Sequence, residues 1–237
     1  MEIRKARMPE RPPRAAWIGI PLAACAFMCI TLTPAFTQIG ADPPKRLVAD
    51  NPAESNRAED MPGWMRRGLP GTGHAALKPL VGVWRARLEI YGTLGRHGDE
   101  PPIISEDVTT RRKWVGDGRV LEDTTEGTAM GMPIWRAGWL AYSNMERRYE
   151  WVTIDNINTT MMSYKSASGS GPRLPISLVG AFIDQGVAGE ETVGKRVQMR
   201  TVLRIDNNDR HVFELFFTRP GAKETLATRY TYSRVSE

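Results

Sequence analysis

The sequence predicts an all-β fold, an antiparallel barrel of about ten strands with a short helix in front of it. From Trp84 onward, polar and apolar residues alternate in short runs, which is the pattern of strands that bury one face. Residues that favour turns separate the runs at hairpin length. Closing such a meander into a barrel removes the exposed strand edges, so we expect a closed barrel rather than an open sheet.

The first expected strand begins at Trp84 and is apolar at every second residue as far as Ile90. The other expected strands are 107–115, 119–125, 134–143, 148–155, 159–165, 174–183, 196–205, 211–217 and 226–234. Glycine, asparagine and proline separate them, as in 116–118, 169–172, 186–189, 207–209 and 220–221. The one helical pattern, about His74–Leu80, precedes the first strand, and we expect it to plug one barrel end.

The N-terminal part, residues 1–41, has the organisation of a targeting segment. Ala15–Phe36 carries no charge and is about 33 Å long as a helix, enough to cross a bilayer core. Basic residues precede it and favour a cytoplasmic N-terminus. Small residues at 33–35 fit a cleavable signal peptide, and the length equally fits a retained membrane anchor. Both alternatives predict export, to the periplasm or to the outer side of the cytoplasmic membrane.

Residues 42–70 predict a flexible linker, because they are rich in proline and charge and poor in large apolar side chains. The barrel domain then spans residues 71–237. The chain has a net charge of +5, but much of the excess lies in residues 1–14, so nucleic acid is not an expected partner. Both cysteines, Cys25 and Cys29, lie in the apolar segment, which argues against a cysteine-ligated metal in the barrel, and no other metal motif is present.

Gly82-Val83-Trp84 at the start of the first strand resembles the glycine-x-tryptophan signature of the calycins, the superfamily of lipocalins, fatty-acid-binding proteins and nitrobindins. The resemblance implies that Arg234, near the end of the last strand, lies across Trp84 and closes the barrel base. Such a contact is a cation–π interaction that joins the two ends of the domain.

The stretch from Trp64 to Arg234 also resembles the bacterial family known as domain of unknown function 1579. The blocks that carry this resemblance include Trp64-Met65, Gly82–Trp84, Met130–Pro133, Ile154-Asp155, His211–Glu214 and Tyr230–Arg234. The resemblance implies a calycin-like barrel and supplies no established reaction. The chain departs from the family where an aromatic residue, glutamate and glycine are usual, because Ile134, Trp135 and Arg136 stand there.

Four residues are the candidate ligand-binding side chains: Trp151, Asp155, Tyr164 and His211. Trp151 and Asp155 share one strand face, and His211 shares a face with Phe213. If these faces point inward, an aromatic wall and a polar anchor meet in one cavity. The alternatives are a hairpin-end hydrogen bond for Asp155 and a core or rim position for His211.

We therefore expect a non-catalytic barrel that binds a small, partly apolar molecule, and we assign no catalytic or metal-binding residue. Three alternatives stay open. The first is a cavity enzyme that uses Asp155 or His211 as a general base. The second is a barrel that binds haem through His211. The third is an anchored scaffold for a protein partner, with membrane contact through a retained N-terminal segment.

Overall fold

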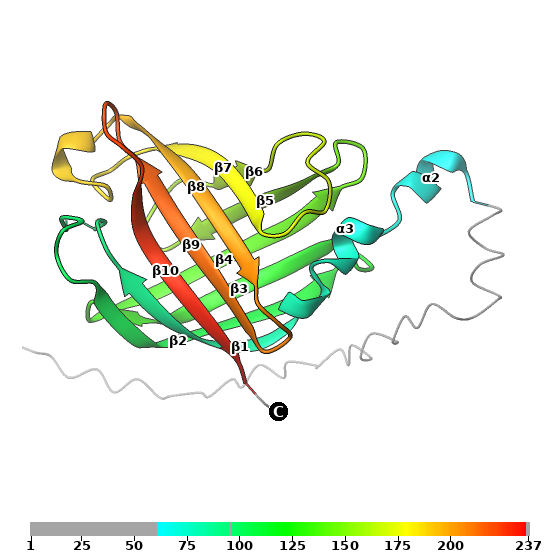
Figure 1. The fold of residues 1–237 in the computed structure, drawn as a ribbon, viewed down its shortest axis with the longest axis horizontal. Coiled ribbons are helices and arrows are strands. Elements are labelled where there is room, and N and C mark those ends of the chain that lie inside the picture. Colours follow the sequence, from blue (N-terminus) through cyan, green and yellow to red (C-terminus); the bar gives the residue numbers. More distant parts are fainter. Residues whose placement is uncertain (1–60, 95, 236–237) are drawn as a thin grey trace, which may run out of the picture. The chain divides into compact units, whose positions relative to one another are not determined.

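The computed structural model describes residues 61–94 and 96–235, and within them ten antiparallel strands form one closed barrel (Figure 1). Each strand pairs with its neighbour in the chain, and β1 also pairs with β10 to close the ring. This confirms the predicted fold class. The strands are β1 (Gly82–Ile90), β2 (Ile103–Val115), β3 (Val120–Ala129), β4 (Met132–Ser143), β5 (Arg148–Asp155), β6 (Met162–Lys165), β7 (Ile176–Ile183), β8 (Arg196–Ile205), β9 (Arg210–Thr218) and β10 (Thr225–Arg234).

Three strands differ from their predicted bounds by three residues or more. β3 ends at Ala129 rather than at residue 125, because its pairing with β4 continues as far as Met132. β2 begins at Ile103 rather than at residue 107, because one extra residue in β2 between Ser105 and Val108, opposite Ala86–Leu88 of β1, lets the earlier residues continue the ladder. β6 begins at Met162 rather than at residue 159, because Asp155 accepts hydrogen bonds from the next loop and directs the chain away from the sheet.

The barrel base is closed where its first and last strands meet. Trp84 is the register partner of Arg234, is fully buried, and carries the guanidinium carbon of Arg234 4.1 Å from its ring centroid. Arg234 also donates to the carbonyls of Val81, Pro79 and Asn208, and so joins both chain ends of the barrel to the β8–β9 turn. Gly82 has φ 126°, and a Cβ there would lie 2.5 Å from Arg234 Nη1, which explains the glycine of the signature.

Short helices close the same end, where a plug was predicted. Helix α3 (Thr72–Ala75) and the 3-10 turn η1 (Lys78–Leu80) precede β1, and Leu77 and Leu80 are buried in the core. The hydroxyl of Tyr149 donates to the carbonyl of Gly73, and His74 packs edge-on against Tyr142. These contacts fill this end of the barrel.

The end of the predicted linker is attached to the barrel. Helix α2 (Gly63–Arg67) precedes a segment in which the carbonyls of Arg67 and Leu69 accept from the side-chain amide of Asn144. The predicted N-terminal segment, 1–41, and most of the predicted linker lie outside the described residues. Within the described residues, no helix combines the length and apolar character needed to cross a membrane.

Candidate ligand-binding cavity

A cavity of about 340 Å³ occupies the half of the barrel away from Trp84. Its wall uses Leu88 and Ile90 of β1 and Phe213 to Phe217 of β9, whereas the opposite ends of these strands belong to the closed base. Most lining side chains are apolar, as is expected for the inward-facing positions of a small β-barrel. They include Leu94, Ala129, Ile134, Trp151, Met162, Phe182, Met199, Phe213, Leu215 and Phe217.

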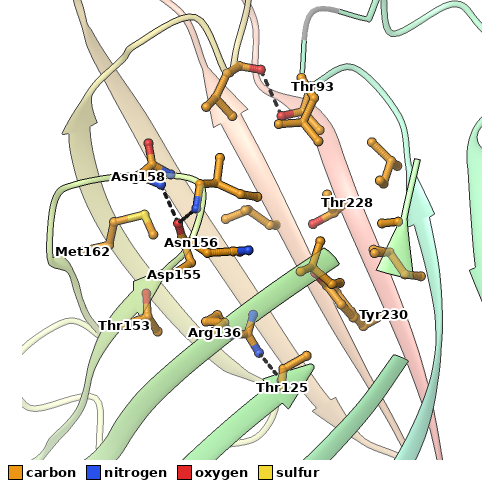
Figure 2. Close-up of a pocket in the computed structure, with 18 of the residues that line it drawn as sticks. Thr93, Thr125, Arg136, Thr153, Asp155, Asn156, Asn158, Met162, Thr228 and Tyr230 are labelled. Atoms are coloured by element: carbon orange, nitrogen blue, oxygen red, sulfur yellow. Dashed lines mark hydrogen bonds between the residues drawn. The ribbon is translucent and has the colours of Figure 1, made fainter. Parts of the chain in front are cut away.

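Three loops meet at the mouth of the cavity. The carbonyl of Val187, in the β7–β8 loop, accepts hydrogen bonds from the Thr93 hydroxyl at 3.0 Å and from the Leu94 amide at 2.6 Å, both in the β1–β2 loop. Gln185 donates to the carbonyl of Ile157 in the β5–β6 loop at 2.5 Å. Thr93 and Asn158 mark these loops in Figure 2. The bonds hold the mouth together across strands that are not neighbours in the barrel.

The β7–β8 loop is organised around the buried carboxylate of Asp184. It accepts hydrogen bonds from the amides of Gly186, Val187 and Ala188 and from the hydroxyl of Thr192. A buried carboxylate needs such donors, because burial removes it from water. Asp184 therefore fixes the position of Val187 at the mouth.

Arg136 is the charged side chain that reaches into the cavity from β4. Its Nη2 donates to Asp123 at 3.2 Å and to the hydroxyl of Thr125 at 3.3 Å, as Figure 2 shows for Thr125. Its guanidinium carbon lies 5.3 Å from the ring centroid of Trp151, 5.4 Å from Phe213 and 5.7 Å from Tyr230. The aromatic wall predicted from Trp151 is therefore present, and it surrounds a cation.

Asp123 connects Arg136 to the barrel base. Its other oxygen accepts from Arg112 Nε at 2.6 Å, and Arg112 Nη1 lies 2.7 Å from Nε2 of His211. Burial alone would raise the pKa of Asp123, but the charges of Arg112 and Arg136 lower it below its usual value. Burial alone would lower the pKa of Arg136, but Asp123 and, with smaller effects, the nearby tyrosines raise it. Both side chains of this ion pair are thus charged.

Several buried polar atoms around the cavity have no hydrogen-bond partner among the described residues. They include Nε of Arg136, Nε1 of Trp151 and the hydroxyl of Thr228. All three side chains line the cavity. Buried polar groups are usually paired, so orphaned atoms on a cavity wall indicate where a ligand or ordered water makes contact.

Three of the predicted ligand-binding residues, Trp151, Asp155 and Tyr164, line the cavity. Trp151 packs edge-on against Phe213 and tilted against Tyr164. Asp155 lies at the mouth, and its Oδ1 accepts from the amides of Ile157 at 2.9 Å and Asn158 at 2.7 Å (Figure 2). The alternative of a hairpin-end hydrogen bond therefore describes the position of Asp155.

His211 does not line the cavity, which corrects the prediction that it faces the ligand. It is fully buried at the base, edge-on to Trp84 at 4.2 Å between ring centroids and stacked on Tyr232 at 4.3 Å. Because arginine only donates, Nε2 of His211 accepts from Arg112 and the proton is on Nδ1. Burial, Arg112 and Arg234 lower its pKa to about 2.

These contacts do not fit a haem ligand or a general base. His211 is fully buried, Tyr232 stacks on its ring, Trp84 packs edge-on against it, and Arg112 occupies its acceptor nitrogen, so this nitrogen is not free to bind an iron. A base with a pKa of about 2 is almost never protonated near neutral pH. Across residues 61–94 and 96–235, no cluster of three or more histidine, cysteine, aspartate or glutamate side chains is arranged to hold a metal.

Sequence reasoning missed the Arg112–Asp123–Arg136 cluster, although alternation carries a signal for it. Arg112 is in phase with the buried residues Val108 and Thr110, and Arg136 is in phase with Ile134 of the cavity wall. An arginine in an inward phase either crosses to the surface or requires a buried partner. Arg136 also stands where the family resemblance leads us to expect glycine.

Residues 69–234 match a family described as a protein of unknown function, DUF1579. The chain belongs to this family. None of the proteins with curated descriptions matches it. Among solved structures, the barrel is similar to an S-type phycobiliprotein lyase, CPES, from Guillardia theta, with 10% sequence identity and a TM-score of 0.42. The match covers 75% of this chain and 99% of that one. That name describes the lyase and assigns no ligand to this chain.

Proposed function

We propose that the barrel binds a small, partly apolar molecule in its cavity and holds it without converting it. The observation that carries this proposal is the cavity itself, about 340 Å³ with a mainly apolar wall and few polar groups. Cavities of this size and composition are typical of small-molecule sites in proteins. A barrel that served only as a protein scaffold would gain nothing from an interior left unfilled, because packed interiors are more stable.

The polar groups of the cavity support binding rather than catalysis. Burial raises the pKa of Tyr164 and of Tyr230 to about 12, so neither phenol exchanges protons readily near neutral pH. Arg136 stays charged beside Asp123. Asp155, the carboxylate on the cavity wall, already accepts hydrogen bonds from two backbone amides of its own loop. These groups orient a molecule and leave no base ready to attack it.

Native mass spectrometry of the purified full-length protein tests the proposal, because it detects a small molecule that co-purifies. Ala129 lines the cavity and is buried, so Ala129→Phe fills the space. Ala141 lies one residue out of phase with the inward positions of β4, so Ala141→Phe is the matched control. We expect the ligand mass in the wild type and the control and its loss in Ala129→Phe.

A fluorescent probe that brightens in apolar surroundings covers the case of a ligand lost in purification. 8-Anilinonaphthalene-1-sulfonate should bind the wild type and Ala141→Phe and bind Ala129→Phe at least tenfold more weakly. Circular dichroism establishes that both variants are folded. Equal binding by all three folded proteins would place the ligand outside the cavity and contradict the proposal.

We also propose that the barrel acts outside the cytoplasm, on the strength of the uncharged segment 15–36 and the basic residues in front of it. Fractionation of cells that produce the full-length chain should find the barrel in the periplasm or on the outer side of the cytoplasmic membrane. Recovery of the intact chain in soluble cytoplasm would contradict this assignment.

A further inference from the structure

We propose that the ligand is an apolar molecule with one carboxylate group, and that Arg136 binds this carboxylate inside the barrel. The inference rests on the proposed function and specifies the class of ligand. It also replaces the negatively charged anchor that the sequence indicated, Asp155, with a positively charged one. Asp155 would select a cation or a hydrogen-bond donor, whereas Arg136 selects an anion.

The charged cluster inside the barrel holds two guanidinium groups and one carboxylate. The side chains of Arg112, Asp123 and Arg136 are 5%, 3% and 15% exposed. Asp123 lies closer to Arg112, at 2.6 Å, than to Arg136, at 3.2 Å. His211, which also contacts Arg112, is neutral. The interior therefore carries an excess positive charge, and Arg136 is its less well paired part.

Asp155 does not balance this charge, although it is the register partner of Arg136 on the neighbouring strand. No ion pair joins the two side chains among the described residues, where the ion pairs of Arg136 comprise Asp123 alone. The Oδ1 of Asp155 accepts from two loop amides instead, and Figure 2 shows Arg136 directed toward Thr125. Asp123 is shared between two guanidinium groups, so an anion from outside the chain is the natural partner of the remaining positive charge.

The free donors of Arg136 fit a carboxylate. Its Nη2 is used by Asp123 and Thr125, whereas its Nε is buried without a partner in the described part of the chain. The hydroxyl of Thr228 on the same cavity wall is also unpaired. A guanidinium group donates charge-assisted hydrogen bonds to a carboxylate, and the ring centroids of Trp151 and Phe213 lie 5.3 and 5.4 Å from the guanidinium carbon of Arg136.

The position of Arg136 also sets the orientation of the ligand. Arg136 lies away from the mouth loops, which Thr93 and Asn158 mark in Figure 2. Apolar residues line the way between them, including Ile134, Ile90 and Val187. We therefore expect the carboxylate to enter first and the apolar part to fill the cavity toward the mouth.

Isothermal titration calorimetry of the full chain tests the inference at pH 7.5 with two probes that share a ten-carbon chain, the anionic decanoate and the neutral 1-decanol. Decanoate should bind the wild type at least about tenfold more tightly, because hydrogen bonds to charged groups are worth this much. Methyl decanoate, which has no charge, should bind like the alcohol. In Arg136→Gln the affinities for decanoate and 1-decanol should agree within about threefold, with that for 1-decanol unchanged.

An exterior variant serves as the control. Arg111, which pairs with Glu126 on the barrel exterior, is 58% exposed, and Arg111→Gln should keep the full preference for decanoate. If Arg136→Gln does not fold, Arg136→Lys keeps the charge without the planar guanidinium group. The ratio of its affinity for decanoate to its affinity for 1-decanol should then be lower than in the wild type and still greater than one.

The outcomes separate the inference from the proposed function. Equal binding of decanoate and 1-decanol by the wild type would overturn the inference and leave the binding function standing. A preference that survives in Arg136→Gln would overturn the role of Arg136. Binding of neither probe, together with no co-purifying ligand, would overturn the proposed function itself.

Discussion

The neutral, buried His211 predicts that the barrel loses stability as the pH falls from 7 to 5. Its pKa is lowered to about 2 in the folded protein, against about 6.5 in the unfolded chain. Between these values the unfolded state binds a proton at this residue and the folded state does not. Stability is therefore fully present above pH 6.5 and declines as the pH falls toward 2.

The size of the effect follows from the difference between the two pKa values. Each pH unit below the unfolded pKa costs about 1.4 kcal/mol of unfolding free energy. Lowering the pH from 7 to 5 should therefore remove about 2 kcal/mol through His211 alone. His74 has a smaller lowering of its pKa, caused by burial and by Arg119, and adds to the same slope. Aspartate and glutamate mostly titrate below this window.

Urea unfolding at pH 7, 6 and 5, followed by circular dichroism, measures this slope. His211→Gln removes the titrating group and keeps an oxygen that can accept from Arg112, so its slope should be flatter by about 2 kcal/mol over the window. His74→Gln should flatten the slope less. Because only slopes are compared, any constant cost of either substitution drops out. A wild-type stability that is equal at pH 7 and pH 5, or an unchanged slope in His211→Gln, would refute the reasoning.

Other predictions concern packing and the mouth. Trp84→Ala should lower the unfolding free energy by about 3–5 kcal/mol in urea titrations, because it empties the fully buried base, and a loss below about 1 kcal/mol would contradict the closure role. Gly138→Ala places a Cβ 2.6 Å from Nε1 of Trp151, so it should displace the indole and weaken binding of 8-anilinonaphthalene-1-sulfonate with little change in circular dichroism. Asp184→Ala removes a carboxylate that accepts four hydrogen bonds, and should speed amide exchange in residues 184–194 at a cost of about 2 kcal/mol; unchanged exchange would argue against its role.

The strands could be predicted from the sequence because one side of the barrel faces water, which imposes a period of two on each strand. Trp84 and Arg234 could be paired because the family resemblance assigns them a shared position. The same alternation predicted that Trp151 and Tyr164 point inward, and both line the cavity. Alternation tells which face a residue is on, and this was enough for aromatic side chains that fill the space beside them.

Alternation does not tell how far along the barrel a residue lies, and this is where the site differs from the prediction. His211 and Phe213 share an inward face, yet His211 lies in the base and Phe213 lines the cavity. The direction of a long side chain is also a property of its three-dimensional neighbours. Arg136 turns to Asp123 on β3 rather than to Asp155 on β5, a choice between two adjacent carboxylates that one sequence does not specify.

The contact between Trp84 of the first strand and Arg234 of the last strand also determines when the barrel can close. Trp84 receives its partner from the last strand, so the base stays open on the ribosome until nearly all of the domain has been synthesised. Contacts between residues so distant in sequence form late and slow the folding of β-proteins. The barrel therefore cannot be completed before its last strand has left the ribosome, and until then the edge of β1 that pairs with β10 has no partner.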